Sequence, residues 1–557
     1  MAMVSTSSAS KPFEEAVTLT GFGLFNLYTL LVTGGCLMCV IIETMSAMFI
    51  IPAAQCDLQL SLEEKGILYS ISFFGVVSSS HLWGFLADTR GRKMVVLVSL
   101  VLSCAVSLVG SQVSATWLFI ALRFLNGFLI GGSSAIIYAY AGEFHDNKYR
   151  PKVVSWIATF VALGNVFLPG MAWLILPLEI TPKSWRILMI VYSLPSLLFA
   201  ILAWFLPESP KYLLTQGKNE EALTILKKMF SLNTGKKSDE YPVASILSFE
   251  GSSVHHEKNE RWLRSMWEQT IPLFKITYLT KTLMVSYLHF AIFLTSSSVI
   301  MWYPQILNSM SEYGKIVPQE EVTICKSILY EEEINDIDAI SSNSTIIKSL
   351  VDSNPKMCND IINEEVFLVT MLVGASFGVC YICIGTFINI TGTRRLLLGF
   401  VIITTISGIC AQFLSGYTYI LIALGIFLLV SPTIGIVNAV IVDLYPTEIR
   451  GMALAVSLMF GRLGAMAGSN ITGPLMYNVC DYMLYIFAAI HVLVIIVIYL
   501  LPSKKSTFKE EISGRHDSAP IKGIDYYYDV NTYVWAIRIH AAALFHQDIF
   551  CREDFRG

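Results

Sequence analysis

Apolar residues recur in long runs along this chain, and short polar loops separate most of the runs. An α-helix needs roughly 20 mostly apolar residues to cross the hydrocarbon core of a bilayer, and its backbone polar groups then bond within the helix. Twelve runs meet this requirement, so the pattern predicts an all-α membrane protein with twelve transmembrane helices. The expected spans are 25–52, 66–87, 94–113, 116–141, 152–176, 184–206, 281–303, 365–388, 395–414, 417–442, 452–477 and 482–501.

Two parts of the chain repeat one loop pattern about 300 residues apart. The segment Gly84–Lys93, GFLADTRGRK, is echoed by Gly385–Arg395, GTFINITGTRR. An acidic residue seven positions before an arginine is repeated as well, at Glu143–Arg150 and Asp443–Arg450. Since both echoes have nearly the same offset, we predict two pseudo-symmetric six-helix halves, an arrangement that many carriers build around a central site.

The composition supports insertion in a membrane. Hydrophobic residues make up 54% of the 557 residues and charged residues 14%, whereas roughly a quarter of the residues in a soluble chain are charged. The net charge of −4 is uninformative by itself, and no nucleic-acid partner is expected. Met1–Lys11 is polar and lacks the features of a cleaved signal peptide, so we expect the first span to act as an uncleaved signal.

Lysine and arginine in the short loops predict the orientation. They are concentrated in the loops after the second, fourth, eighth and tenth spans. Because cytoplasmic loops carry an excess of these residues, both termini are expected in the cytoplasm. Within the long linker, residues 217–229 have the pattern of a short amphipathic helix. The expected organisation is an N-terminal cytoplasmic segment (1–24), a first half (25–206), a cytoplasmic linker (207–280), a second half (281–502) with a luminal or extracellular loop (304–364), and a cytoplasmic tail (503–557).

The loop 304–364 is acidic and carries two expected modifications. Asn343 begins an Asn-Ser-Thr glycosylation acceptor. Cys325 and Cys358 share this loop and would lie in an oxidising compartment, so a disulfide between them is our preferred interpretation. The C-x-x-C pairs within the first and eighth spans lie inside apolar helices without nearby His or acidic ligands, and we interpret them as packing residues rather than metal ligands.

Three motifs resemble the loop signatures of the major facilitator superfamily. They are Gly84–Lys93, with the pattern G-x-x-x-D-x-x-G-R-K, Pro207–Leu213, PESPKYL, and Tyr445–Gly451, YPTEIRG. Within that superfamily, Gly21–Phe25, Ser78–Gly84 and the long glycosylatable loop are similar to the synaptic vesicle glycoprotein 2 branch. The resemblance covers roughly residues 20–502 and implies a twelve-helix carrier fold with alternating access. No cofactor is expected.

The chain departs from that branch at two places. Relatives often carry two acidic residues three positions apart in the first span, whereas the matching positions here look like Val40 and Glu43. The second loop motif has Asn389 where the superfamily has Asp.

The resemblance also implies a gate at the cytoplasmic ends of the helices. In the superfamily, charged residues of these loops form a network that holds the outward-open state, and opposite charges recur here at matched positions in both halves. The alternative is a set of positive-inside loops that fix only the topology. The gate candidates are Gly84, Asp88, Gly91, Arg92, Lys93, Glu143, Arg150, Glu208, Arg394, Arg395, Asp443 and Arg450.

Several polar residues lie inside the predicted spans. An ionisable group within the bilayer is costly and usually faces a cavity, so Glu43 is a candidate proton carrier or cation partner. Its alternative role is a carboxyl group hydrogen-bonded between helices. Arg123 could bind an anionic group or extend its side chain to the membrane surface. The other candidates for a substrate or proton site are Asn126, Asn165, Tyr287, Trp302, Asn438 and Asn470. Trp302 could instead be an anchor at the membrane surface, and His289 has no visible ligand set, so no metal is expected.

We therefore predict a secondary active transporter that moves a small polar or charged organic solute by alternating access, with protons as one candidate coupling ion. The rival interpretation is a non-transporting vesicle membrane glycoprotein that acts as a scaffold or regulator. An enzyme is not expected, because neither a nucleophile with its base nor a phosphate-binding loop is apparent. The expected partners are the lipid bilayer and the solute, and a monomer is expected to suffice for function. The expected location is the plasma membrane or an intracellular vesicle membrane.

Overall fold

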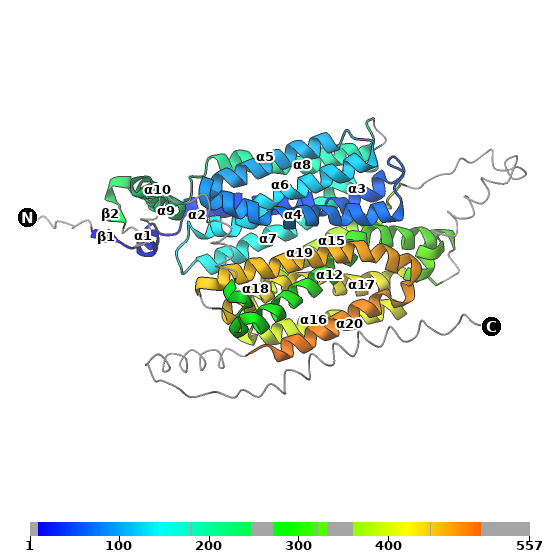
Figure 1. Ribbon diagram of the computed structural model, residues 1–557. Coiled ribbons are helices and arrows are strands. Elements are labelled where there is room, and N and C mark those ends of the chain that lie inside the picture. The colour runs from blue at the N-terminus through cyan, green and yellow to red at the C-terminus, as the bar shows by residue number, and fades with distance from the viewer. Residues whose placement is uncertain are drawn as a thin grey trace, which may run out of the picture. The chain divides into compact units, whose positions relative to one another are not determined.

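The computed structural model describes residues 9–178, 181–246, 271–317, 321–330, 360–445 and 447–502. In these ranges, twelve helices are long and apolar enough to cross a bilayer, which confirms the predicted all-α membrane fold. They form two six-helix halves, coloured blue to cyan and green to orange in Figure 1.

The first half begins with α2 (Leu24–Met45), which α3 (Ala47–Ala54) continues. It goes on with α4 (Leu62–Arg90), α5 (Arg92–Gly110), α6 (Thr116–Gly142), α7 (Arg150–Ile175) and α8 (Ser184–Trp204). The second half contains α12 (Ile276–Ile316), α15 (Glu364–Thr391), α16 (Thr393–Phe413), α17 (Tyr417–Leu428), the 3-10 turn η2 (Ser431–Thr433), α18 (Ile434–Leu444), α19 (Thr447–Asn478) and α20 (Cys480–Leu500).

Two of the spans are interrupted for local reasons. The first is divided at Ser46, whose hydroxyl donates to the backbone oxygen of Glu43 at 3.0 Å, and a hydroxyl that bonds to the preceding turn can bend a helix. The tenth is divided between α17 and α18 at η2, which contains Pro432. Proline has no backbone N–H and cannot continue the hydrogen-bond pattern of a helix.

The seventh helix is longer than predicted. We expected it to end at residue 303, but α12 continues through Pro304 to Ile316, so the following loop begins later than residue 304. The polar run at 295–298 does not break it either, because Thr295, Ser296 and Ser298 donate to backbone oxygens of the preceding turn.

The repeated loop motif forms the same turn in both halves. Gly91 separates α4 from α5 with φ of +105°, and Gly392 separates α15 from α16 with φ of +85°. A residue with a Cβ rarely adopts such angles, so the glycine in each copy of the motif has a conformational reason.

Buried apolar side chains in the described ranges form three cores. We call the end of the halves that carries Arg92 and Arg394 the basic face, and the end that carries Asp57 and Cys480 the distal face. The core toward the distal face contains residues of both halves, such as Phe49 and Phe367, whose ring centroids lie 5.8 Å apart. Toward the basic face, each half has a core of its own. The halves thus share one apolar core toward the distal face and have separate apolar cores toward the basic face.

Segments before the first span and after the sixth form one small module, at the left of Figure 1. Strand β1 (Ala9–Lys11) pairs in parallel with β2 (Val243–Ile246). The module also contains α1 (Phe13–Leu19), α9 (Pro210–Thr215), α10 (Asn219–Thr234) and the 3-10 turn η1 (Ser238–Glu240). The amphipathic helix predicted at 217–229 is confirmed as α10, whose apolar side chains pack in the core of the first half.

Asn233 of α10 connects this module to the first span. Its side-chain amide donates to the backbone oxygens of Thr20 and Gly21 and to the side chain of Asn26. Its side-chain oxygen accepts from the backbone N–H of Phe25 at 3.1 Å. The start of α2 is therefore fixed by a residue that follows it by about 200 positions.

The predicted disulfide between Cys325 and Cys358 is wrong. Cys325 is bonded to Cys480, with 5.6 Å between their Cα atoms. The segment 321–330 folds back over the distal ends of the helices, where the N–H of Gly416 donates to the oxygen of Val322 at 2.8 Å. The prediction considered only the two cysteines of one loop. The observed pairing depends instead on which helix ends lie close together in the folded protein.

Cys56, which follows α3 at the same face, is disulfide-bonded as well. The predicted glycosylation site Asn343, the residue Cys358 and the tail from residue 503 lie outside the described residues.

Candidate functional site

Glu43 lies in the interior of the first half, where its side chain is 2% exposed. Its Oε2 atom accepts hydrogen bonds from Ser107 Oγ at 2.7 Å and from Asn126 Nδ2 at 3.0 Å, and its Oε1 atom accepts one from Ser196 Oγ at 3.4 Å. Four helices, α2, α5, α6 and α8, therefore meet at this carboxyl group.

Arg123 lies beside this carboxyl group. It is 2% exposed, and its guanidinium donates to the backbone oxygen of Glu43 at 3.2 Å. The side chain therefore does not extend to the membrane surface, which was one of its two predicted roles. A buried carboxyl group and a buried guanidinium lower the cost of burying each other's charge.

Asn126 completes the Glu43 cluster and leaves one atom unused. Its Nδ2 also donates to Ser103 Oγ at 3.0 Å and to Ser107 Oγ at 2.8 Å. Its buried Oδ1 accepts no hydrogen bond from the part of the chain that the structure describes. Buried acceptors are usually satisfied, so this oxygen is an exception within the cluster.

Two predicted candidates lie where the halves meet. Asn470 of α19 donates to Ser70 of α4. Trp302 donates from Nε1 to the backbone oxygen of Ser469 at 2.9 Å, and its ring lies 4.8 Å from that of Tyr69 in the other half. Trp302 is fully buried, so it is not an anchor at the membrane surface.

The other three candidates are scattered. Asn165 Nδ2 donates to the backbone of its own helix, and Tyr287 OH donates to the oxygen of Ile490 at 3.5 Å. The buried Oδ1 of Asn438 has no partner among the described residues. The predicted candidates therefore do not form one site.

Arg462 is a residue of the inter-half contact that the sequence analysis did not select. Its guanidinium donates to Ser80 Oγ of α4 at 3.0 Å and to Ser134 Oγ of α6. The sequence does mark Arg462 as a candidate, because it lies near the middle of the predicted span 452–477. A charged side chain at that depth is costly in a bilayer and usually has a function.

At the basic face, the gate candidates of the first half form a compact network. Arg92 pairs with Glu143 at 2.9 Å and with Asp88 at 3.3 Å, and Ser209 donates to Glu143. Burial raises the pKa of the Glu143 carboxyl, and the charge of Arg92 and the Ser209 hydrogen bond oppose that rise. Glu208 accepts from the backbone N–H groups of Arg92 and Lys93, where an anion is stabilised by the N-terminus of α5.

Known protein families match most of this twelve-helix chain in sequence. The sequence profile of the Sugar (and other) transporter family matches residues 22–316, and that of the Major Facilitator Superfamily matches residues 360–546. The chain belongs to the Sugar (and other) transporter family of the major facilitator superfamily.

Curated relatives within the superfamily include synaptic vesicle glycoproteins. The chain is 28% identical to synaptic vesicle glycoprotein 2B of Mus musculus over 321 residues, which are 53% of this chain and 47% of that protein. It is 29% identical to synaptic vesicle glycoprotein 2A of Rattus norvegicus over 347 residues, which are 56% of this chain and 46% of that protein. The chain thus spans about half the length of the curated relatives it matches.

Solved structures of major facilitator proteins have the same fold. A partially occluded inward open conformation of the xylose transporter XylE from E. coli superposes with a TM-score of 0.59 at 15% identity, over 86% of this chain and 100% of that one. The nucleoside transporter NupG superposes with a TM-score of 0.54 at 12% identity, over 86% of this chain and 99% of that one. At these identities the likeness shows the major facilitator fold alone.

In this major facilitator chain, the gate candidates of the second half make different contacts from those of the first. Arg394 donates to the backbone oxygen of Leu501 at 3.0 Å, and Arg450 donates to that of Tyr445 at 3.3 Å. In the first half, Arg150 pairs with Glu14 at 3.0 Å. The ion pairs of Arg92 and Arg150 lie within the first half and its module.

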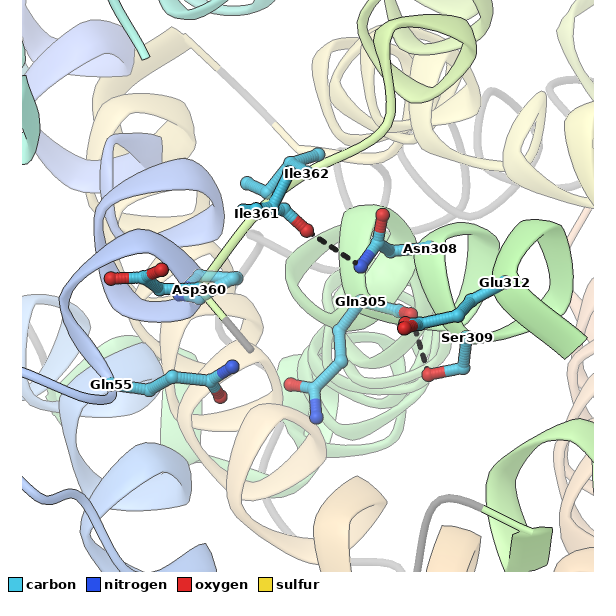
Figure 2. A pocket seen from close by; sticks show the side chains of 9 residues that line it. Gln55, Gln305, Asn308, Ser309, Glu312, Asp360, Ile361 and Ile362 are labelled. Atoms are coloured by element: carbon cyan, nitrogen blue, oxygen red, sulfur yellow. Dashed lines mark hydrogen bonds between the residues drawn. The ribbon is translucent and has the colours of Figure 1, made fainter. Parts of the chain in front are cut away.

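A polar pocket lies at the distal face of the major facilitator fold, between α3 and α12 (Figure 2). Asn308 Nδ2 donates to the backbone oxygen of Ile361 at 3.1 Å, which holds the segment before α15 against α12. None of the predicted site residues lines this pocket, so we do not assign the substrate to it. The lining residues are Pro52, Gln55, Gln305, Asn308, Ser309, Glu312, Asp360, Ile361 and Ile362.

Proposed function

We propose that this protein is a secondary active transporter that moves a small polar or charged organic solute by alternating access. The observation that carries the proposal is the division of the apolar cores. Residues of both halves share one core toward the distal face, while toward the basic face each half has its own. Halves that share an apolar core at one face only can exchange this arrangement for the opposite one by rocking.

The basic face is assigned to the cytoplasm in this proposal, which makes the conformation inward-facing. The excess of lysine and arginine in its loops supports the assignment. The disulfide between Cys325 and Cys480 supports it as well, because it lies at the distal face and disulfides persist in oxidising compartments.

Glu43 is the proposed proton carrier. Its carboxyl group is buried, it accepts hydrogen bonds from three side chains, and Arg123 lies close enough to influence its charge. A change in the protonation of Glu43 would alter its attraction to Arg123 and the packing of α2 against α6. Binding or release of a proton at Glu43 would thus change the packing of helices in the first half. Such a change would couple proton movement to the movement of the solute.

Transport and its coupling can be tested with the full chain in liposomes. Uptake is measured under an imposed pH gradient for organic cations, organic anions and sugars, with Glu43→Gln as the variant. We expect accumulation that follows the gradient in the wild type and is lost in Glu43→Gln. The control is Glu240→Gln, which removes an exposed carboxylate from η1. Uptake by Glu43→Gln with unchanged pH dependence would exclude Glu43 as the carrier.

The rocking motion has a separate test. Phe49 and Phe367 face each other across the halves at the distal face, so Phe49→Cys/Phe367→Cys allows a short bifunctional thiol reagent to join the halves there. Cross-linking is expected to stop uptake in the double variant and to leave each single variant active. Full uptake by the cross-linked protein would contradict alternating access.

A second candidate function is a non-transporting membrane glycoprotein that acts as a scaffold. The similarity to synaptic vesicle glycoproteins 2A and 2B favours it, as does the apolar Val40 near Glu43 in the first span. Binding of a solute without turnover in the liposome experiment would favour this alternative over transport.

A further inference from the structure

Arg462 places a positive charge deep in the membrane-spanning part of the protein. It lies 13 residues after the start and 16 before the end of the span Ile449–Asn478. At about 1.5 Å per residue, its Cα is about 20 Å from one end of the helix and about 24 Å from the other. These distances exceed the length of an arginine side chain, so Arg462 cannot reach the membrane surface.

The partners of Arg462 carry no negative charge. The guanidinium donates to the hydroxyl groups of Ser80 and Ser134, which belong to the other half. Among the described residues, none of the ion pairs includes Arg462. A charged side chain at this depth is costly, and two hydroxyl groups compensate it less well than an anion would.

The carboxyl groups that could have served as counter-ions have other partners. Glu43 is held by Ser107, Asn126 and Ser196 within the first half. Asp88 and Glu143 pair with Arg92 at the basic face. Arg462 thus differs from Arg123, the other deep arginine, which lies beside Glu43.

The surroundings of Arg462 are polar and only partly buried. Arg462, Ser80, Ser134 and Tyr138 are each half-buried, whereas Arg123 is 2% exposed. The charge of Arg462 acts on the phenol of Tyr138, and Tyr381 from α15 is near enough to Tyr138 to interact with it. Hydroxyl, phenol and guanidinium groups from both halves therefore gather around one positive charge.

We propose that Arg462 is a substrate-recognition residue, and that the substrate is an organic anion whose carboxylate or phosphate group binds its guanidinium. The inference rests on the proposed transport function and narrows its substrate class. The two terminal nitrogens that now donate to Ser80 and Ser134 have the spacing that binds a carboxylate or phosphate through two parallel hydrogen bonds. The hydroxyl groups of Ser80 and Ser134 can donate to the same anion.

The site also connects substrate binding to the movement of the halves. Arg462 comes from the second half and both hydroxyl partners come from the first, so an anion bound there is held by both halves. Exchange of the serine hydroxyls for the anion changes the bonds that join the halves. A ligand can shift a conformational equilibrium only through such a difference between the two states.

The test compares probes of one shape and different charge. Benzoate, phenyl phosphate, benzamide and benzylamine are titrated into the purified full chain, and binding is measured by calorimetry. We expect the anions to bind more tightly than benzamide, and benzylamine to bind least. Arg462→Gln is expected to weaken the binding of the anions roughly 10- to 100-fold, as loss of charge-assisted hydrogen bonds would, and to leave benzamide unchanged. The two anions distinguish carboxylate from phosphate recognition.

Three further variants separate recognition from a purely structural contact. Ser80→Ala/Ser134→Ala removes the present partners of Arg462 and should preserve the preference for anions. Arg462→Lys keeps the positive charge but cannot form two parallel hydrogen bonds, so it should weaken the binding of benzoate more than that of benzamide. If Arg462→Gln does not fold, this variant tests anion recognition in its place. Lys237→Gln, which removes an exposed positive charge after α10, is the control and should match the wild type.

The outcomes separate this inference from the proposed transport function. Equal affinity for the four probes, no detectable binding of either anion, or equal weakening of every probe in Arg462→Gln would overturn the anion site. Transport of sugars or cations that is unaffected by Arg462→Gln would overturn it while transport itself stands. Anion binding that depends on Arg462, with no uptake of any solute, would overturn the transport proposal and leave Arg462 as an anion-binding residue.

Discussion

The carboxylate of Glu208 lies directly against Gly91, at the turn between α4 and α5. A Cβ atom on Gly91 would come within 2.3 Å of Glu208 Oε2, while Glu208 Oε1 accepts from the N–H of Arg92 at 3.0 Å. Two motifs that are far apart in the sequence, Gly84–Lys93 and Pro207–Leu213, thus form a single contact at the basic face. This contact explains why the first motif needs a glycine here and why the second contributes an acid.

Gly91→Ala is therefore expected to destabilise the protein. Alanine would be strained at φ of +105° and would collide with the Glu208 carboxylate, which together should cost about 1–3 kcal/mol. The measurement is the melting temperature of the purified protein. Gly399→Ala is the matched control, because a Cβ there meets nothing within 4 Å and its melting temperature should not fall. Equal melting temperatures for Gly91→Ala and the wild type would contradict the contact.

Glu143 should give the protein a pH-dependent stability. Its pKa is raised by burial, against the charge of Arg92 and the hydrogen bond from Ser209. A group whose pKa rises on folding stabilises the protein below its unfolded pKa, and this contribution is lost as the pH rises through the folded pKa. The melting temperature of the wild type relative to Glu143→Gln is therefore expected to fall as the pH rises from about 4.

The control for this change of net charge is Glu240→Gln, which removes an exposed carboxylate. A wild type that gains stability relative to Glu143→Gln over the same rise in pH would show that the pKa of Glu143 is depressed on folding, contrary to this prediction.

Asp57 at the distal face should show the opposite dependence. Burial alone would raise its pKa, but the Arg186 guanidinium at 3.0 Å and the Lys183 ammonium at 3.6 Å outweigh burial and hold the pKa below its ordinary value. The stabilisation is present above the unfolded pKa and is lost as the pH falls through the folded pKa. The wild type should therefore melt above Asp57→Asn at neutral pH, and this advantage should shrink below about pH 4. An advantage that persists undiminished in acid would be the contrary result.

The Cys325–Cys480 disulfide can be mapped directly. Digestion without reduction, followed by mass spectrometry, should yield a peptide that joins these two residues, which are 155 positions apart. Because the bridge closes a long loop of the unfolded chain, Cys480→Ser is expected to lose about 3–5 kcal/mol of stability. Cys410→Ser, which removes an exposed free thiol, should not lower the melting temperature. A peptide that joins Cys325 to Cys358 would restore the pairing predicted from the sequence.

The predictions that were confirmed depend on short stretches of chain. Each span was recognised from its own run of apolar residues, because a helix that crosses a bilayer must satisfy its backbone internally. The repeated loop motif was also visible in short stretches, and the structure places a left-handed glycine, Gly91 or Gly392, in each copy. The selection of Glu43 as a candidate, which stays a prediction, also needed only its place in an apolar run.

The errors and omissions concern contacts between distant segments. Cys325 was paired with the wrong cysteine, and Asn233 was not recognised as the residue that fixes the start of α2. Arg462 was overlooked, although its position in a span was visible, because its importance lies in the absence of a counter-ion near it among the described residues.

Hydropathy and repetition along the chain sufficed to determine a membrane protein of twelve helices in two related halves, because the bilayer imposes its length and polarity on each helix separately. Only the tertiary structure decided which faces of those helices meet. It gave Glu43 its three hydrogen-bond donors, placed Arg462 against Ser80 and Ser134 of the other half, and gave the halves a shared apolar core toward the distal face. These relationships depend on the rotation and tilt of whole helices, which are set by many weak packing contacts at once and leave no pattern in a short window of residues.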